Sequence, residues 1–330
     1  MRPTYKNSLF LVALTALIGG ILIVFSIISF KTKETEKAPD YSATLKPERK
    51  TIEKEEDVSL IFLGDLMTDR YIRTVLKKNG DEFLLENRLS EKLQNADGVV
   101  ANLEGPITSL PSKSVGTEAG SPENYSFTMP EKETLAFLEK QNIQTVNLGN
   151  NHILNFGKEG LEKTKRSLDN HQINYFGDPE KKDNYLIESF NGLRIAFVNY
   201  NQFSENAKAR AGKSIEKSQE EADFSILYAH WGDEYSTVSG PDQQSLSRYF
   251  IKKGADLIVG SHPHVVQESD IYQGVEIYYS LGNFIFDQYF SPETRKGLLL
   301  EAKIQKNGEI SLKETNIKLE PSGQTALSKD

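Results

Sequence analysis

Two histidines separated by one proline, His262 and His264, are the residues of this chain best placed to do chemistry. They lie at residues 260–264, directly after the apolar run at 256–259, which predicts a buried strand. Because Pro263 cannot donate a hydrogen bond to a neighbouring strand, we expect the pair in a loop beyond the strand end. Ligands of α/β proteins bind at such ends, and two imidazoles this close in sequence can converge on one ion.

Four of the five histidines follow predicted strands in this way. His152 ends a Gly-Asn-Asn-His block that comes after the apolar run at 145–148. His230 comes just after the apolar run at 225–228. A turn with surface histidines would explain any one of these positions, but the recurrence favours metal or phosphate chemistry.

Other polar residues also stand at the predicted strand ends. Together with the histidines they are Asp65, Asn102 with Glu104, Asn151 with His152, His230 with Glu234, His262 with His264, and Asn283 with Asp287. Carboxylates, amides and imidazoles of this kind can hold one or two divalent metal ions. Two ions about 3.5–4 Å apart can polarise a phosphoryl group, and a nearby histidine that binds no metal can protonate the leaving group.

Several of these positions have a simpler explanation. Asp65 after a glycine could cap a helix, and Asn102 and Asn283 could hydrogen-bond only to loop backbone. His230 beside a tryptophan could be a packed core residue, and Glu234 a surface acid. No single residue decides between these interpretations, so the metal hypothesis depends on the ordered set.

The composition limits which metals and partners are possible. The chain has no cysteine, so a metal site must use His, Asp, Glu and Asn, which suits manganese, zinc, iron or magnesium. The net charge is −8, and residues 1–30 contain Arg2 and Lys6 but no acids, so the rest carries −10. A body this acidic argues against a nucleic-acid partner.

The N-terminal part predicts a membrane anchor. Residues 9–30 are uncharged and strongly apolar, and as a helix they could cross a hydrocarbon core of about 30 Å. A cleaved signal peptide is the alternative, but no Ala-x-Ala site follows. We therefore expect a short cytoplasmic N-terminus at 1–8, one transmembrane signal-anchor at 9–30, a flexible linker at 31–57, and the large domain outside the cell.

The remainder predicts one α/β domain at 58–318. Strands alternate with helices, and the helices are expected at 71–78, 83–95, 131–140, 157–170 and 243–253. The segment at 107–129 has little periodicity, which is typical of a functional flap or a mobile loop. A hairpin is expected around Asn191-Gly192, and a closing antiparallel pair at 297–304 and 309–312. The tail at 319–330 is predicted to be disordered.

Six blocks in order carry a family resemblance. They are Gly64-Asp65-x-Met67, Asn102-Leu103-Glu104-Gly105-Pro106, Asn150-Asn151-His152, His230-Trp231-Gly232-x-Glu234-Tyr235, Gly260-x-His262-Pro263-His264-Val265-x-Gln267 and Tyr279-Ser280-Leu281-Gly282-Asn283-Phe284. Over about residues 58–288 they resemble the bacterial poly-γ-glutamate capsule-synthesis proteins of the CapA/PgsA type. That family is similar to calcineurin-like metallophosphoesterases, which implies a two-sheet sandwich flanked by helices (α/β/β/α).

The resemblance also implies roles for individual residues. His152 corresponds to the general acid, and the metal ligands would be Asp65, Glu104, Asn151, His230, His262 and His264. Asn102, Glu234, Asn283 and Asp287 would line the site. Three positions depart from the pattern, because Met67 replaces a histidine ligand, Glu104 replaces a shorter aspartate, and Asn155 replaces an aspartate of many relatives. A thioether binds hard metals poorly, so one of two metal sites is expected to be weak or absent.

Three functions remain open from the sequence. The resemblance implies a membrane-anchored component of a poly-γ-glutamate synthesis and export complex, with the polymer, a membrane-embedded subunit and an ATP-dependent ligase as partners. The chain has no Gly-rich phosphate loop with a lysine, so it is not expected to be the ligase itself. The first alternative is a metal-dependent hydrolase of an unidentified phosphoester. The second is a metal-free scaffold that has the same fold.

Overall fold

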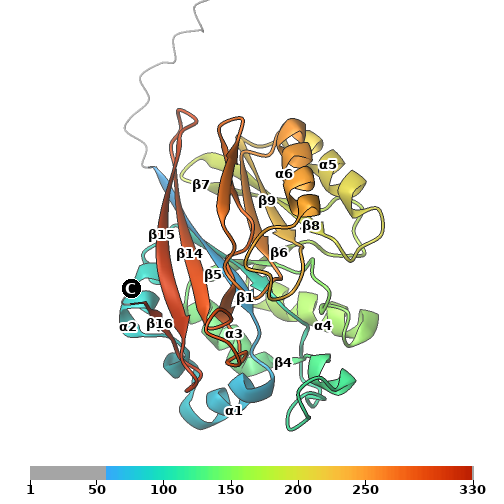
Figure 1. Cartoon of the computed structure of the whole chain (residues 1–330), viewed down its shortest axis with the longest axis vertical. Coiled ribbons are helices and arrows are strands. Elements are labelled where there is room, and N and C mark those ends of the chain that lie inside the picture. The colour runs from blue at the N-terminus through green and yellow to red at the C-terminus, as the bar shows by residue number, and fades with distance from the viewer. Residues whose placement is uncertain (1–56, 329–330) are drawn as a thin grey trace, which may run out of the picture. The chain divides into compact units, whose positions relative to one another are not determined.

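The computed structural model of this chain describes residues 57–328 (Figure 1). The predicted N-terminus and membrane span, and all of the predicted linker except Asp57, lie outside the described residues. Between residues 57 and 328, no helix has both the length and the apolar character needed to cross a membrane. The described strands form an eight-stranded sheet, a six-stranded sheet and a two-stranded pair.

The eight-stranded sheet contains the first strand of the domain. Its strands are β1 (Val58–Leu66), β2 (Gly98–Leu103), β5 (Ile143–Asn147), β6 (Asn174–Phe176), β13 (Asn283–Ile285), β14 (Lys296–Ile304), β15 (Ile310–Leu319) and β16 (Thr325–Leu327). They lie in the order β16-β15-β14-β1-β2-β5-β6, and β13 also pairs with β1. Because β1, β2, β5 and β6 run parallel, their carboxyl ends share one edge of the sheet.

The six-stranded sheet is also mostly parallel. Its strands are β7 (Tyr185–Phe190), β8 (Leu193–Asn201), β9 (Phe224–His230), β10 (Leu257–Ser261), β11 (Ser269–Tyr272) and β12 (Val275–Tyr278), in the order β11-β12-β10-β9-β8-β7. The neighbours β8, β9, β10 and β12 run parallel. β7 and β8 form the hairpin predicted around Asn191-Gly192.

The helices connect these strands. They are α1 (Arg70–Asn79), α2 (Asn87–Gln94), α3 (Glu131–Lys140), α4 (Gly157–Asn170), α5 (Ala207–Ser218) and α6 (Pro241–Lys253), with short 3-10 turns η1 (Asp81–Leu84) and η2 (Pro122–Tyr125). The two-stranded pair is β3 (Ile107–Thr108) with β4 (Met129–Pro130). The predicted bounds of α3 and α4 are confirmed, and α1 and α6 differ from their predictions by one or two residues at an end.

Alternating side chains of β1 separate two layers of core. Ile61 and Leu63 pack with residues from α1 to α4, whereas Leu60 and Phe62 pack against the six-stranded sheet. A third cluster lies between the outer face of the six-stranded sheet and the helices α5 and α6 (Figure 1). The described residues therefore form helix, sheet, sheet and helix layers, as predicted.

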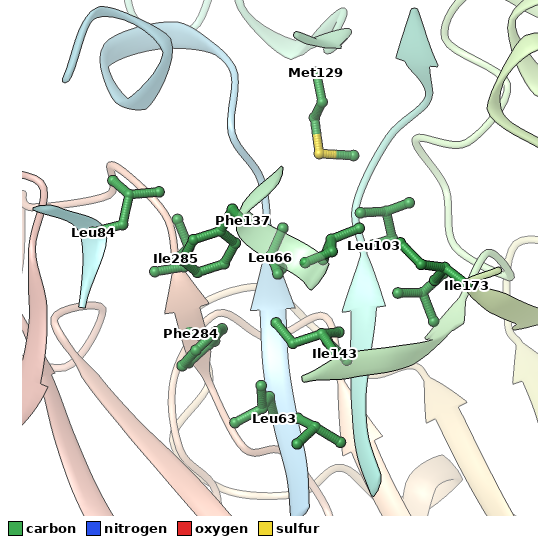
Figure 2. Packing of buried hydrophobic residues seen from close by; sticks show 14 of the residues in the cluster. Leu63, Leu66, Leu84, Leu103, Met129, Phe137, Ile143, Ile173, Phe284 and Ile285 are labelled. Atoms are coloured by element: carbon green, nitrogen blue, oxygen red, sulfur yellow. The ribbon is translucent and has the colours of Figure 1, made fainter. Parts of the chain in front are cut away.

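Figure 2 shows part of the core between the eight-stranded sheet and its helices. Leu66 of β1 lies with Ile285 of β13 on one side and Leu103 of β2 on the other, and Phe137 of α3 lies close by. All four side chains are buried. This apolar layer holds the ends of β1, β2 and β13 together, directly beside the polar residues that follow.

Two predictions fail for a shared reason. The expected helix at 83–95 is broken, because Leu85 forms a bridge to Thr325 and the Glu86 N–H donates to the Thr325 carbonyl at 2.9 Å. The tail expected to be disordered from 319 instead contains β16, which pairs antiparallel with β15. Thr325 is buried and also donates to the Phe284 carbonyl at 2.7 Å.

The segment at 107–129 is held down by one buried carboxylate. Asp69 accepts hydrogen bonds from the hydroxyls of Ser112 and Ser114, at 3.0 and 2.8 Å, and from the Thr128 N–H at 2.9 Å. The segment predicted to be a flap or a mobile loop is therefore tied to the residue just before α1. This fixes one wall of the space beside the strand ends.

Candidate metal centre

Strand pairing places three of the predicted polar residues side by side. Asp65 lies opposite Asn102 of β2 and Asn283 of β13 in the sheet register. A Cβ atom at Gly64 would lie 1.8 Å from the Gly282 carbonyl oxygen, so only glycine permits this approach. The Asp65 N–H can then donate to that carbonyl at 3.0 Å. Asp65 thus belongs to β1, and its interpretation as a helix cap is wrong.

Asp65, Glu104 and His264 form a compact buried group, which we call the carboxylate group. One potential ligand atom from each lies within 4.8 Å of the others. His264 Nδ1 is 3.2 Å from Asp65 Oδ2, and His264 Nε2 is 3.5 Å from Glu104 Oε1. Within residues 57–328 it is the only such group of three acids or histidines, and its donors suit a divalent cation.

Asn151, His230 and His262 lie together in a second group, which we call the imidazole group. His230 Nε2 is 2.8 Å from Asn151 Oδ1, and the rings of His230 and His262 are 4.7 Å apart between centroids. The His262 N–H donates to Asp65 Oδ2 at 3.2 Å, which joins this group to the carboxylate group. Sequence segments from both sheets therefore meet at one place.

The backbone around the histidine pair is unusual. His262 has a φ of +98° and His264 a φ of +58°, in the left-handed region that non-glycine residues rarely adopt. The pair follows β10 in a loop, as Pro263 predicts, but the sequence does not reveal these dihedral angles. Such strain persists where neighbouring contacts hold it, and here the Tyr235 N–H donates to the Pro263 carbonyl at 2.8 Å.

Two buried polar atoms of these groups have no hydrogen-bond partner among the described residues. They are Glu104 Oε1 and His262 Nδ1. An unpaired buried polar atom costs free energy, so native structures rarely contain one without a reason. A carboxylate oxygen and an imidazole nitrogen are both metal ligands, and the two atoms therefore fit bound divalent cations.

The two carboxyl groups titrate in opposite directions. Burial raises the pKa of Glu104 well above its ordinary value, and the neighbouring Asp65 raises it further. Burial would also raise the pKa of Asp65, but the hydrogen bond and charge of His264 outweigh it and lower that pKa. Without a cation, Asp65 is ionised and Glu104 tends to keep its proton. A cation would favour the ionised form of both.

Burial favours the neutral forms of three histidines, His152, His230 and His262. Burial lowers the pKa of His152 to about 4, and burial followed by the charge of His264 lowers that of His262 to about 4. Burial and then His262 lower the pKa of His230 well below its ordinary value. Neutral imidazoles are the form that binds metal, so these residues can act as ligands near neutral pH.

His152 lies at the edge of the carboxylate group. Its Nε2 is 3.8 Å from Glu104 Oε1, its ring packs on Phe127 at 4.3 Å, and its Nδ1 is 3.1 Å from Asn155 Oδ1. The same Asn155 oxygen accepts a hydrogen bond from the Phe127 N–H at 2.9 Å. Because an amide oxygen can only accept, the His152 nitrogen facing it, Nδ1, must carry the imidazole proton. His152 Nε2 then carries a lone pair and would accept a proton before donating one.

Two of the predicted lining residues support the carboxylate group. The Asn102 side-chain amide donates to Asp65 Oδ1 at 2.8 Å and to Glu104 Oε2 at 3.3 Å. Asn283 Oδ1 lies 3.0 Å from His264 Nδ1. Both asparagines therefore orient potential ligands instead of only binding loop backbone.

The other two predicted lining residues lie outside both groups. Glu234 is exposed, and Asp287 forms an ion pair with Arg70. Arg70 belongs to none of the sequence motifs, and only its place shortly after the Asp65 block could have pointed to it. Met67 is fully buried. Its sulfur accepts a hydrogen bond from the Asp69 N–H at 3.0 Å, and Met67 is not a member of either ligand group.

Comparisons with known proteins agree on one family. A family model described as "Bacterial capsule synthesis protein PGA_cap" matches residues 59–288. The "Capsule biosynthesis protein CapA" of Bacillus anthracis is 30% identical over 278 residues, which are 78% of this chain and 66% of that protein. The "PGA biosynthesis protein CapA" of Bacillus subtilis (strain 168) is 28% identical over 332 residues, covering 94% and 81%.

Solved structures give a more distant likeness. The crystal structure of a phosphatase from Mycoplasma pneumoniae matches with a TM-score of 0.48 and 16% sequence identity. The match covers 80% of this chain and 94% of that one.

Proposed function

Because this chain belongs to the family of bacterial capsule synthesis proteins described as PGA_cap, we propose that it acts in the synthesis of a poly-γ-glutamate capsule. The observation that carries this role is the family match over residues 59–288, which includes every residue of the carboxylate and imidazole groups. The Bacillus anthracis relative is longer, and this chain spans 66% of it.

The proposed location is the cell membrane, with a single pass and the described domain outside the cell. The apolar sequence at 9–30 supports this location. There the domain would meet the emerging polymer, together with a membrane-embedded subunit and the subunit that carries out ATP-dependent ligation. The acidic composition supports the exclusion of nucleic acid as a partner.

The proposed cofactor is one or two divalent metal ions, chosen among manganese, zinc, iron and magnesium. Asp65, Glu104 and His264 would hold one ion, and the unpartnered Glu104 Oε1 supports that assignment. The imidazole group beside them would hold the second. A bound ion would supply Lewis acidity to a hydrolytic reaction at an amide or phosphoester.

The residues of the chain would handle the proton and exclude water. His152 Nε2 faces the carboxylate group and would exchange a proton with the reacting molecule. Asn155 would keep the imidazole oriented through Nδ1. The rings of Phe127 and Phe286 pack on His152 and His264, respectively, and shield that side of the site from solvent.

The second candidate function is that of a metal-dependent phosphoester hydrolase with a substrate unrelated to the polymer. The juxtaposition of two ligand groups favours it, because two adjacent cations are an arrangement used by phosphatases. A metal-free scaffold of the same fold is the third candidate, and absence of bound metal would support it.

The deciding experiment is elemental analysis of the purified full-length chain, compared with a His262→Ala/His264→Ala variant and with His171→Ala as control. His171 is the fifth histidine and lies at the end of α4, paired with Glu139 away from the site. We expect close to stoichiometric metal in the wild type and the control, and none in the double variant. Absence of metal from all three after dialysis against divalent ions would leave the scaffold as the function.

A further inference from the structure

A pocket of about 400 Å³ adjoins the carboxylate group. Residues from the segment at 114–125 line it, together with Tyr235, Asp287, Gln288 and Phe290. The Tyr235 ring lies 6.2 Å from the His264 ring. A molecule in the pocket would therefore contact Tyr235, whose ring lies next to a member of the carboxylate group. Volumes of this size are typical of small-molecule sites.

Arg70 lines this pocket, and its charged side chain is nearly buried. Its side chain is only 11% exposed, and its guanidinium lies over the rings of Phe127 and Phe286, at 5.0 and 5.3 Å from their centroids. Its Nη1 donates to Asn124 Oδ1 at 3.2 Å, and its Nη2 is paired with Asp287. Its Nε is buried and has no hydrogen-bond partner within residues 57–328.

Asp287 fixes both the backbone and the side chain at Arg70. Arg70 has a φ of +49°, which is rare for a residue other than glycine. The next N–H along the chain, from Tyr71, donates to Asp287 Oδ2 at 3.0 Å. One carboxylate thus holds the arginine in a strained conformation, with part of its donor set unused. Strain maintained in this way is frequent at binding sites.

The charges and walls of the pocket indicate the kind of ligand. Among its described lining residues, Arg70 is the only cation and Asp287 the only anion. A dianionic phosphate would need more positive charge, whereas a single carboxylate can bind an arginine that keeps free donors. Aromatic side chains that are 40–66% exposed also line the pocket, and they are Tyr71, Tyr125, Tyr235 and Phe290. Such rings pack well on methylene groups and amide planes.

We propose that this pocket is a substrate subsite that receives one carboxylate-bearing unit of a γ-linked glutamate chain, with Arg70 binding the carboxylate. The inference rests on the proposed function and extends it, because it names the residue that recognises the polymer. A γ-linked unit has one carboxylate, two methylene groups and an amide, which match the cation and the aromatic walls. The neighbouring unit of the same chain would then lie at the proposed metal centre.

The test is calorimetric titration of the full-length chain with synthetic penta-γ-glutamate and, separately, with phenyl phosphate. Arg70→Gln should weaken binding of the peptide about 10- to 100-fold, the range for lost hydrogen bonds to a charged group. Asp287→Asn should tighten it, because it releases the arginine from its ion pair. Arg88→Gln makes the same change of charge at an arginine that is 67% exposed, and it should bind like the wild type.

Several outcomes would overturn the subsite. They are a wild type that does not bind the peptide, an Arg70→Gln variant that binds it equally well, or Arg70-dependent binding of phenyl phosphate alone. If Arg70→Gln does not fold, the Asp287→Asn variant tests the subsite instead. Peptide binding by this variant that is weaker than or equal to that of the wild type would mean that the Arg70–Asp287 ion pair is only structural. Metal content measured on the same samples separates the two proposals. A wild type without metal refutes the metal centre, whereas a metal-loaded wild type without Arg70-dependent binding refutes only the subsite.

Discussion

Glu104 is a buried carboxyl group next to a second carboxyl group, Asp65. Burial first, and Asp65 second, raise its pKa well above the ordinary value of 4.5. A carboxyl with a raised pKa in the fold stabilises the protein fully below its unfolded pKa, and this contribution disappears as pH rises through the folded pKa. Without metal, the wild type should therefore lose stability towards alkaline pH because of this residue.

Glu104→Gln removes the loss of stability at alkaline pH, because glutamine does not ionise, and it also removes a proposed metal ligand. We expect the metal-free variant to melt above the metal-free wild type at pH 8, with the gap closing below pH 4.5, where both side chains are neutral. In a domain of this size each kcal/mol corresponds to about 2–4 °C. Added metal should stabilise only the wild type. Calorimetry checks this, with the exposed Glu220→Gln as control, and identical melting of the Glu104→Gln variant and wild type at pH 8 would contradict it.

Asn155 provides the second test at the residue level. Burial lowers the pKa of His152 to about 4, and Asn155 contacts the ring at Nδ1 without contributing a charge. Asn155→Asp would place a carboxylate there, and an opposite charge at this distance raises the pKa of a histidine by about 1–3 pH units. NMR titration of the His152 ring measures the change. Asn307→Asp, on an exposed turn far from the site in sequence, should leave it unaltered.

At the level of elements, the segment at 107–129 depends on Asp69. This carboxylate accepts hydrogen bonds from Ser112, Ser114 and Thr128, and it pairs with Arg73 at 2.6 Å. Asp69→Ala would leave these buried donors unpaired, at a cost of about 3–5 kcal/mol in stability. We expect faster amide exchange and proteolysis in the segment, while the exposed Glu118→Gln in the same segment should behave like the wild type. Unchanged protection in Asp69→Ala would mean that other contacts hold the segment.

Local patterns in the sequence were sufficient for elements with regular periodicity, such as α3, α4 and the hairpin of β7 and β8. They failed where distant segments meet. The contact of Leu85 and Glu86 with Thr325 breaks a helix and orders the tail, and it joins residues about 240 positions apart, which no local pattern shows. The meeting of polar residues at the strand ends could be predicted, but the ion pair of Arg70 with Asp287 could not, because it too depends on a contact distant in sequence.

For the whole molecule, the two sheets are joined at the proposed metal centre. Asp65 belongs to β1 of the eight-stranded sheet and Glu104 follows β2 of the same sheet, whereas His264 follows β10 of the six-stranded sheet. An ion bound only by the native state stabilises it by about 2.7 kcal/mol at one hundred times its dissociation constant. We expect a chelator to lower the melting temperature of the wild type and of His171→Ala, but not that of the His262→Ala/His264→Ala variant. A chelator effect that persists in the double variant would place the ion outside both ligand groups.

The hydrogen bond from the His262 N–H to Asp65 spans 197 residues of sequence, and it has a consequence for the order of assembly. Closing so long a loop delays such contacts until much of the chain is available. A nascent chain that ends before residue 264 lacks His264, one of the three members of the carboxylate group, however well its first sheet has formed. The ion would thus be captured late, and its presence would mark molecules that have completed synthesis and folding.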